Sequence, residues 1–461
     1  MKKALQIKCR SFRYAFGSET VLENLEMEIN YGEVTLISGL SGSGKSTLLS
    51  LVNGIIPRVV QGEFDGEILI DGWNSRYKTM SQISRKVGNV LQNAEAQIIH
   101  QLVEDEIAFG CENLAFDCEE IHRQIKKTSS LMELKPDWKT RSLSGGQKQR
   151  LVTASTLAMK GDILIFDEPL ANLDGRGAKI LLDLLKKLAG EGKAILLVEH
   201  RLDVVLPFVD SVWQLKDKKV EKISDKDAFL KSQTDIIEDS DENHLSFSEN
   251  VLEIQGIKKA YGKREILRGI YLNVKKGERI LLSGENGCGK STLMSIIARL
   301  EKADGGKVIQ HFDKNLGKRA GKKWFSLCGL VYQNPNYQLF MPTVREEILF
   351  GAKEKEYALS LAEDFGLSPL LERHPHSLSE GQKRRVTICA ILAQKTRLLL
   401  LDEPTVGQDY GTLRNMMAIL NKIHREEENT LISITHDIRC MKALCDRRLE
   451  IEDGLIAKNL Q

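Results

Sequence analysis

Two glycine-rich stretches decide the fold of this 461-residue chain: residues 39–47 read GLSGSGKST, and residues 284–292 read GENGCGKST. Both fit the pattern G-x-x-x-x-G-K-[ST]. In this pattern the glycines let backbone N–H groups wrap around phosphate oxygens, and the lysine reaches the outer phosphates. A helix is expected directly after each loop, and its N-terminus adds a favourable dipole. The two loops therefore predict two sites for the phosphates of a nucleotide.

Each loop also predicts a place for a metal ion, because the hydroxyl after its lysine, on Ser46 or Ser291, is a suitable ligand for Mg²⁺. The residues predicted to bind phosphate or metal in these loops are Gly39, Ser41, Gly42, Gly44, Lys45, Ser46 and Thr47 in the first, and Gly284, Asn286, Gly287, Gly289, Lys290, Ser291 and Thr292 in the second.

Further motifs repeat in the same order behind each loop. LSGGQ at residues 143–147 returns as LSEGQ at 378–382, and DEP at 167–169 returns at 402–404. One large domain is therefore present twice, rather than a series of small units. The polar, acidic stretch DIIEDSDE at 235–242 is typical of a linker. We predict a first domain over residues 1–230, an acidic linker over 231–249 and a second domain over 250–461.

Short apolar runs lie directly before several motifs and predict buried parallel strands covered on both faces. These runs are Val34–Ser38, Ile163–Phe166 and Ala194–Val198 in the first half, and Arg279–Ser283, Leu398–Leu401 and Leu431–Ile434 in the second. Ser46–Asn53 and Leu173–Leu188 have helical character, whereas Glu67–Ile70 before Asp71-Gly72 resembles an antiparallel strand that ends in a turn. The pattern indicates an α/β fold with ligand sites at the carboxyl ends of parallel strands.

Composition narrows the class of protein. The chain holds 66 Lys and Arg against 64 Asp and Glu, and this near-neutral balance does not indicate broad affinity for nucleic acid. No apolar run approaches the roughly 18 residues of a membrane-spanning helix. The basic start, MKKALQIKCR, does not have the apolar stretch of a signal peptide. We therefore expect a soluble cytoplasmic chain, and docking to something embedded in the membrane stays open as an alternative to free solution.

The eight cysteines form no C-x-x-C pair, which favours reduced and mostly buried thiols over a zinc site.

Two acidic pairs follow predicted strands. Asp167 and Asp402 stand where a carboxylate supports Mg²⁺, and the next residues, Glu168 and Glu403, are placed to polarise an attacking water. A single acid at a strand end can be structural. An Asp-Glu-Pro sequence in both halves favours a catalytic role.

The order of motifs, a phosphate loop, then Gln, LSGGQ, a strand with Asp-Glu and a strand with His, resembles the ATP-binding-cassette (ABC) ATPases. The resemblance covers nearly the whole chain. It implies two P-loop NTPase domains, each with a mostly parallel sheet, an antiparallel β subdomain and a helical signature subdomain. It also implies that the halves pack head to tail around two ATP molecules, each bound by one half's loop and by the other half's signature. The implied signature residues are Ser144, Gly145, Gly146 and Gln147, and Ser379, Gly381 and Gln382.

The same resemblance assigns further roles. Gln92 and Gln333 would be the glutamines of the Q-loop, which sense the metal and the attacking water. His200 and His436 would contact the γ-phosphate. Asp174 matches the acid of the D-loop, and Asp409 matches it more loosely; Phe16 and Tyr261 are candidates to stack on adenine. Tyr14 competes with Phe16 for the adenine, and either ring could instead belong to the core.

The second signature differs from the first, because Glu380 replaces a glycine. A carboxylate beside phosphate is unfavourable unless it points away. This suggests that the site formed by Lys45 and Ser379 is the weaker of the two.

A finer resemblance links the chain to the ATPase subunit of energy-coupling-factor importers, carried by residues 53–72, 92–114, 198–203 and 333–352. It implies ATP with Mg²⁺, a transmembrane coupling subunit, a small substrate-capturing membrane subunit, and import of a vitamin, a vitamin precursor or a metal ion at the cytoplasmic face of the membrane. The apolar residues Ile98, Ile99, Leu339 and Phe340 would suit a groove for a membrane subunit's helix, or would pack the helical subdomain. The alternative function is that of a soluble tandem ATPase acting on ribosomes or nucleic acid.

Overall fold

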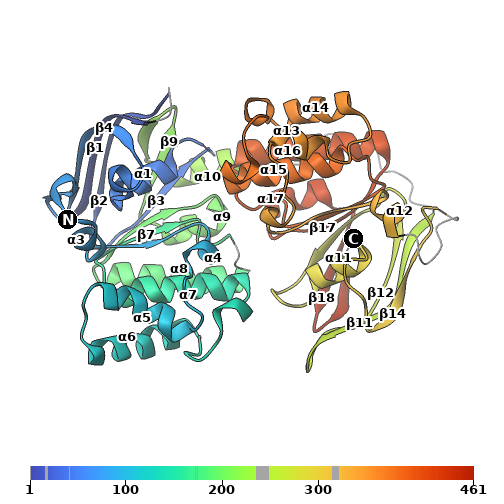
Figure 1. The fold of residues 1–461 in the computed structure, drawn as a ribbon, viewed down its shortest axis with the longest axis horizontal. Coiled ribbons are helices and arrows are strands. Elements are labelled where there is room, and N and C mark those ends of the chain that lie inside the picture. Colours follow the sequence, from blue (N-terminus) through green and yellow to red (C-terminus); the bar gives the residue numbers. More distant parts are fainter. Residues whose placement is uncertain are drawn as a thin grey trace. The chain divides into compact units, whose positions relative to one another are not determined.

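The computed structural model describes residues 2–15, 19–40, 42–171, 173, 175–234, 249–313 and 321–460. The chain divides into two compact units, Met1–Thr234 and Asp235–Gln461, and each is considered by itself (Figure 1). The last helix of the first unit, α10 (Lys226–Thr234), continues past residue 230, and Phe229 on it is buried in that unit's core. Most of the predicted linker lies outside the described residues.

The described part of the first unit contains a six-stranded sheet in the order β10-β9-β3-β8-β7-β6 and a four-stranded antiparallel sheet in the order β2-β1-β4-β5. In the larger sheet only β10 is antiparallel to its neighbour. The strands are β1 (Lys3–Tyr14), β2 (Thr20–Asn30), β3 (Val34–Gly39), β4 (Gly62–Ile70), β5 (Trp73–Asn74), β6 (Val87–Val90), β7 (Ile163–Asp167), β8 (Ala194–Val198), β9 (Ser211–Lys216) and β10 (Lys219–Ile223).

Helices of the first unit connect and cover these strands. They are α1 (Lys45–Val52), α2 (Ile55–Arg58), α3 (Met80–Ser84), α4 (Ala94–Gln97), α5 (Val103–Asn113), α6 (Cys118–Leu131), α7 (Gly145–Ala158), α8 (Gly175–Gly190), α9 (Leu202–Val205) and α10, with the 3₁₀ segments η1 (Ser75–Tyr77), η2 (Thr140–Ser142) and η3 (Leu206–Phe208). Figure 1 shows α5 and α6 beside α7 in a helical region apart from the strands.

The second unit repeats the plan with sheets in the orders β15-β16-β17-β13-β18-β19 and β12-β11-β14 among its described residues. Its strands are β11 (Asn250–Tyr261), β12 (Arg264–Lys275), β13 (Arg279–Ser283), β14 (Gly305–Gln310), β15 (Cys328–Val331), β16 (Leu398–Asp402), β17 (Thr430–Ile434), β18 (Arg447–Glu452) and β19 (Leu455–Leu460). Its helices are α11 (Lys290–Ile297), α12 (Gly321–Phe325), α13 (Val344–Leu349), α14 (Lys355–Asp364), α15 (Glu380–Leu392), α16 (Tyr410–Glu427) and α17 (Ile438–Met441), with η4 (Pro335–Tyr337), η5 (Ser368–Leu370), η6 (Pro375–Ser377) and η7 (Lys442–Leu444).

The predicted apolar runs are the central strands, and their burial explains why they are uninterrupted. Alternate residues of β7 enter two different hydrophobic cores: Leu164 and Phe166 pack on one side, and Ile163 and Ile165 on the other. A strand covered on both faces needs apolar side chains at every position. The α/β fold class predicted from these runs is confirmed.

The predicted antiparallel strand is confirmed as the end of β4. Asp71 and Gly72 both have positive φ, 49° and 81°, and lead directly into β5. Two such residues in a row form the tight hairpin turn that suits the twist of paired strands.

Most cysteines are buried, and all eight are free thiols, as the sequence predicts; Cys118 on α6 is exposed. Among the residues that the structure describes, none of the helices is both long and apolar enough to cross a membrane.

Candidate functional site

The first glycine-rich loop lies between β3 and α1, at the carboxyl end of a central parallel strand. Gly44 caps α1 with φ 105°, and a Cβ there would lie 2.8 Å from the Leu22 side chain, so glycine is required. The buried Lys45 Nζ donates hydrogen bonds to the carbonyl oxygens of Gly39 and Leu40, each at 2.8 Å. The lysine therefore curls back over its own loop, in the position from which it can meet a phosphate.

The second loop, between β13 and α11, has the same geometry. Gly289 caps α11 with φ 107°, and Lys290 Nζ donates to the carbonyl oxygens of Gly284 and Glu285 at 2.7 and 2.9 Å. The other predicted loop residues lie in these loops or in the first turn of the helices that follow: Gly42, Ser46, Thr47, Asn286, Gly287, Ser291 and Thr292. Ser41 lies outside the described residues.

The predicted metal ligands meet at the end of β7. Ser46 Oγ donates to Asp167 Oδ2 at 3.3 Å. Burial, followed by the neighbouring Glu168, raises the pKa of Asp167 to about 6, and burial likewise raises the pKa of Asp402. One hydroxyl and one carboxylate suit Mg²⁺, which takes its remaining ligands from phosphates and water, and no cluster of three or more metal-binding side chains occurs in the described part of the chain.

Glu168 is the centre of a hydrogen-bonded group in the first unit. Its carboxylate accepts from Gln92 Nε2 at 2.9 Å and lies 3.3 Å from His200 Nε2. Burial favours a raised pKa for Glu168, but His200, Lys45 and Gln92 outweigh it, so the pKa is lowered. The structure thus brings together a carboxylate, the predicted Q-loop glutamine and the predicted histidine from three separate segments.

The equivalent group in the second unit is built differently. Glu403 lies 3.4 Å from His436 Nε2, and burial, followed by Asp402, raises its pKa to about 8. The buried Arg384, which stands where the first unit has Gln149, donates to the carbonyl oxygens of Glu403 and of Gln333, the latter at 2.7 Å. The two carboxyls therefore differ in how readily they ionise.

The signature segments form helix N-termini. Ser144 and Gln147 cap α7 reciprocally: Ser144 Oγ accepts from the Gln147 N–H, and Gln147 Oε1 accepts from the Ser144 N–H. Ser379 and Gln382 cap α15 in the same way. Gly145 and Gly146 occupy the first turn of α7, as Gly381 does in α15. Such N-termini present N–H groups and a positive dipole end to an anion.

The predicted adenine-binding aromatics are described in part. Phe16 lies outside the described residues, as does Asp174, so the prediction for Phe16 stays a prediction. Tyr14 and Tyr261 each end a twelve-residue first strand; the Tyr14 hydroxyl lies 2.7 Å from Thr47 Oγ1, and Tyr261 donates to Glu301 at 2.7 Å. Tyr14 therefore lies beside the phosphate loop, as its competing candidacy for the adenine requires.

One buried acid beside this site was missed by the sequence analysis. Glu199, at the end of β8, accepts hydrogen bonds from the backbone N–H of Leu170 at 2.7 Å and of His200 at 3.1 Å. Burial, followed by Glu168, raises its pKa to about 7. The second unit has Thr435 in its place, and this residue shares a hydrogen bond with Thr405. An acid next to a histidine at the end of a buried strand was the available signal.

Replacing Glu199 with glutamine is expected to remove a pH-dependent loss of stability. The carboxyl has a pKa of about 7 in the folded chain and an ordinary pKa of 4.5, so the folded state holds its proton more tightly. This group therefore lowers the free energy of unfolding as pH rises from about 4.5 to about 7, by about 3 kcal/mol at most. Denaturant unfolding of the chain and of E199Q at pH 5 and pH 7.5 should show the variant gaining stability relative to the unaltered chain.

The control for that experiment is E191Q, which changes an exposed acid of the same unit. If the difference in free energy of unfolding between E199Q and the unaltered chain were the same at both pH values, the prediction of a raised pKa for Glu199 would be wrong.

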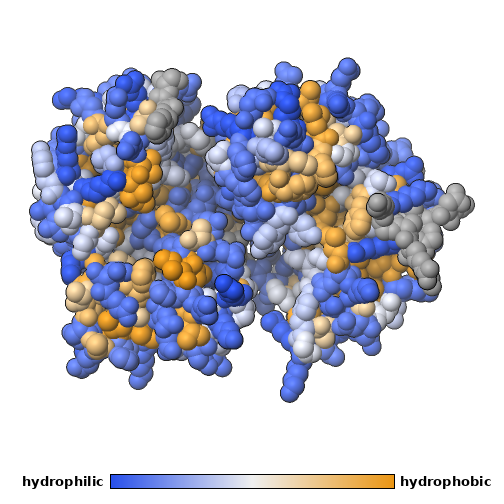
Figure 2. Space-filling view, viewed as in Figure 1, coloured by the Kyte–Doolittle hydropathy of each residue, from blue (hydrophilic) through white to orange (hydrophobic). Residues whose placement is uncertain are grey.

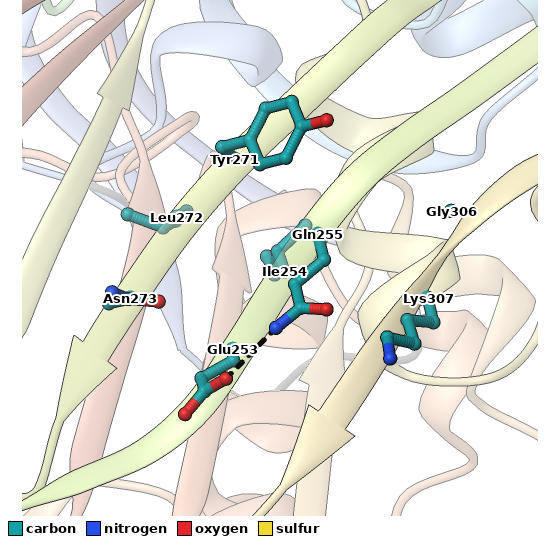
Figure 3. A pocket seen from close by; sticks show the side chains of 8 residues that line it. All are labelled: Glu253, Ile254, Gln255, Tyr271, Leu272, Asn273, Gly306 and Lys307. Carbon is teal, nitrogen blue, oxygen red and sulfur yellow. Dashed lines mark hydrogen bonds between the residues drawn. The ribbon is translucent and has the colours of Figure 1, made fainter.

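A separate concavity of about 830 Å³ lies on the antiparallel sheet of the second unit (Figure 3). Tyr271, Gln255 and Lys307 are among the residues around it, and Gln255 donates to Glu253 at 3.2 Å. None of the predicted nucleotide-binding residues lines it.

The comparisons with known proteins agree with this geometry. The model of the family described as "ABC transporter" matches residues 22–171 and 267–406, which contain both phosphate loops, both signatures and both Asp-Glu pairs. This chain belongs to that family and carries two of its ATPase domains; it is an ATPase that uses ATP.

Similar proteins include one of Treponema denticola, provisionally named an ABC transporter ATP-binding protein, which is 31% identical over 98% of this chain and 96% of its own. A Bacillus subtilis protein, provisionally named the HMP/thiamine import ATP-binding protein YkoD, is 32% identical over 98% of this chain and 90% of its own. Among solved structures, ribosome-bound archaeal Pelota and ABCE1 matches with a TM-score of 0.71 and 21% identity, covering 98% of this chain and 78% of the other. At that identity the likeness concerns the fold alone.

Proposed function

We propose that this ATPase powers the import of a small solute, a vitamin, a vitamin precursor or a metal ion, as the ATP-hydrolysing subunit of an energy-coupling-factor transporter. In this proposal the two units pair head to tail at the cytoplasmic face of the membrane. Each Mg-ATP is bound by one unit's phosphate loop and by the other unit's signature helix. The membrane-embedded partners are a coupling subunit and a small substrate-capturing subunit.

The chain's own residues supply the driving step. Lys45 and Lys290 bind phosphate, Ser46 with Asp167 and Ser291 with Asp402 hold Mg²⁺, and Glu168 and Glu403 polarise water. A γ-phosphate adds contacts to a second helix N-terminus that ADP lacks, and only such differential contacts shift a closed–open equilibrium. Hydrolysis removes the γ-phosphate and with it these contacts, so the two units would then separate.

The observation that carries the transport proposal is an exposed apolar pair at the same place in each unit. In the first unit the pair is Ile99, which is 67% exposed, and Phe109 on α5, which is also exposed and whose ring lies 4.9 Å from that of His100. In the second unit Phe340, 63% exposed, packs edge-on against exposed Phe350 at 5.2 Å. Two equivalent apolar sites suit two helices of a membrane subunit.

Buried acids keep these apolar residues in place. Glu106 accepts from the backbone N–H of Ile99 and of His100, at 2.9 and 2.8 Å. Glu347 accepts in the same way from Phe340 and Met341. A loop ordered in advance loses little entropy when a partner binds.

The predicted groove residues need a correction. Leu339 is buried in the second unit's core, and Ile98 packs partly into the first unit's cores, so these two belong to the helical subdomain. Only Ile99 and Phe340 are open to a partner. The physical reason is that consecutive residues of these loops point to opposite sides, one inward and one outward.

A groove of about 720 Å³ lies between α5 and α6 of the first unit, and its lining indicates the charge of a partner that would bind there. Three acids, Glu104, Asp105 and Glu112, outnumber the one lysine, Lys126, that lines it, and His122, Ile121 and Ile125 also lie along it. Figure 2 shows apolar patches among hydrophilic surface over this helical region. Acidic and apolar side chains together suit a partner helix with basic residues.

The relatives also favour transport over a ribosomal role. Proteins similar over nearly the whole chain at 31–32% identity carry transporter names, one of them for HMP/thiamine import. The structures whose names mention the ribosome or a ribosomal protein are similar at 20–21% identity, which concerns the fold.

Replacing Ile99 and Phe340 with glutamate is expected to reduce recovery of membrane subunits with the tagged chain by at least about tenfold, because a charge would be buried at each contact centre. The test is affinity purification of the full chain from detergent-solubilised membranes of its own organism. The matched control, I180E and L300E, changes exposed apolar residues elsewhere on the two units. Sedimentation of the unaltered chain with ribosomes, and no membrane protein bound to it, would contradict the proposal.

A further inference from the structure

Each signature helix carries a lysine in its first turn, Lys148 on α7 and Lys383 on α15, at equivalent positions of the two motifs. Both side chains are largely buried, with exposed fractions of 17% and 11%. An ammonium that has lost most of its hydration is stabilised by an anionic partner, and the partners here are more exposed than the lysines, at 56% for Glu95 and 27% for Glu380.

The partner in the first unit comes from another segment. Lys148 Nζ lies 2.7 Å from Oε1 of Glu95, on α4. Glu95 follows Gln92 by three residues, and Gln92 donates to Glu168. The ion pair therefore joins the Q-loop, here residues 92–97, to the signature helix of the same unit.

The partner in the second unit comes from the signature itself. In its Q-loop, residues 333–338, Asn336 stands where the first unit has Glu95, and Glu380 stands where it has Gly145. Lys383 Nζ lies 3.0 Å from Glu380 Oε1, and Asn336 Nδ2 lies 3.5 Å from the same oxygen. The carboxylate that pairs with the lysine therefore belongs to the Q-loop in the first unit and to the signature helix in the second.

Sterics explain why the new acid stands at residue 380 and not at 381. A Cβ on Gly381 would lie 2.5 Å from the carbonyl oxygen of Gly407, so that position is closed to side chains. Glu380 is the first residue of α15, where a side chain is tolerated and a negative charge is favourable. Its carboxylate points to Lys383 of its own unit.

We propose that the Lys148–Glu95 pair holds the first Q-loop against the signature helix of the same unit, and that Glu380, paired with Lys383 and beside Asn336 of the second Q-loop, replaces the carboxylate absent at Asn336. Glu380 then stabilises the second signature by pairing with Lys383. In this proposal Lys383 balances the charge of Glu380, which reduces the like-charge repulsion expected at the site formed with Ser379. The inference concerns ATP hydrolysis and does not depend on transport.

The test removes the carboxylate from the second signature helix and then restores one in the second Q-loop. In E380G, Lys383 keeps only an amide neighbour, and we expect kcat for ATP to fall by at least about threefold, the lower end of coupling within one ion-pair network. In N336E/E380G, which copies the first unit's arrangement, kcat should return to within about twofold of the unaltered chain. The mirror pair, E95N and E95N/G145E, should lose and regain activity in the same way.

Three readouts separate positioning from simple loss of folding: kcat, KM for ATP, and the unfolding midpoint. The positioning role predicts that kcat falls more than KM changes while the midpoint stays within a few degrees. Should E380G fail to fold, E380Q and N336E/E380Q serve instead, since glutamine keeps the shape and removes the charge. Equal or higher activity of the single variant, or no recovery in the double variant, would overturn the proposal.

Discussion

Replacing both Glu168 and Glu403 with glutamine is expected to reduce the rate of ATP hydrolysis by at least about a hundredfold, the usual contribution of a positioned general base. Glutamine keeps the volume of the side chain and can still accept one hydrogen bond, from Gln92 in the first unit. It cannot take a proton from water. Phosphate release measured at saturating ATP should fall, while ATP binding measured by calorimetry should be retained.

The two single variants compare the sites. His200, Lys45 and Gln92 outweigh burial to lower the pKa of Glu168, whereas burial and Asp402 raise that of Glu403 to about 8. Since only an ionised carboxylate can act as a base, E168Q and E403Q should retain unequal rates at neutral pH. Equal losses would contradict a functional difference between the sites, and full activity of the double variant would remove both residues from catalysis.

Replacing both Lys45 and Lys290 with alanine is expected to weaken ATP binding by at least about a hundredfold, because each loop loses a buried cation that can make two or more charge-assisted hydrogen bonds. Each ammonium group now donates to two carbonyl oxygens of its own loop. Alanine removes both the charge that would bind phosphate and the hydrogen bonds to these loop carbonyls. Calorimetric titration with Mg-ATP measures the change.

The control is K187A, an exposed lysine near the end of α8, which should bind ATP as the unaltered chain does. Retained affinity in K45A/K290A would show that the loops are not the phosphate sites. A changed affinity in K187A would point to a general effect of charge instead.

Local sequence was sufficient for several features. The spacing of glycines in GLSGSGKST and GENGCGKST predicted a loop between a strand and a helix, since positive φ and close packing at Gly44 and Gly289 admit only glycine. Apolar runs predicted β3, β7 and β8, because strands covered on both faces need apolar side chains throughout. Such features depend on neighbours in the chain.

Other features depended on contacts between distant segments. Tyr14 is one of two candidate aromatics in the sequence, and only the fold shows that its hydroxyl lies beside Thr47 of the phosphate loop. Leu339 and Phe340 are equally apolar neighbours, yet one is core and the other is surface. Burial of a side chain is decided by what packs over it.

The sequence by itself determined that this chain is a duplicated ABC ATPase with two phosphate loops, because those motifs encode local backbone geometry and the chemistry of single side chains. Glu380 and Lys383, three residues apart on α15, pair through helical spacing alone. The tertiary structure decided how charges from distant segments are paired: Glu95 and Lys148 stand 53 residues apart, and only the fold brings them together. An electrostatic interaction depends on distance and burial in space, and neither quantity can be read from order along the chain.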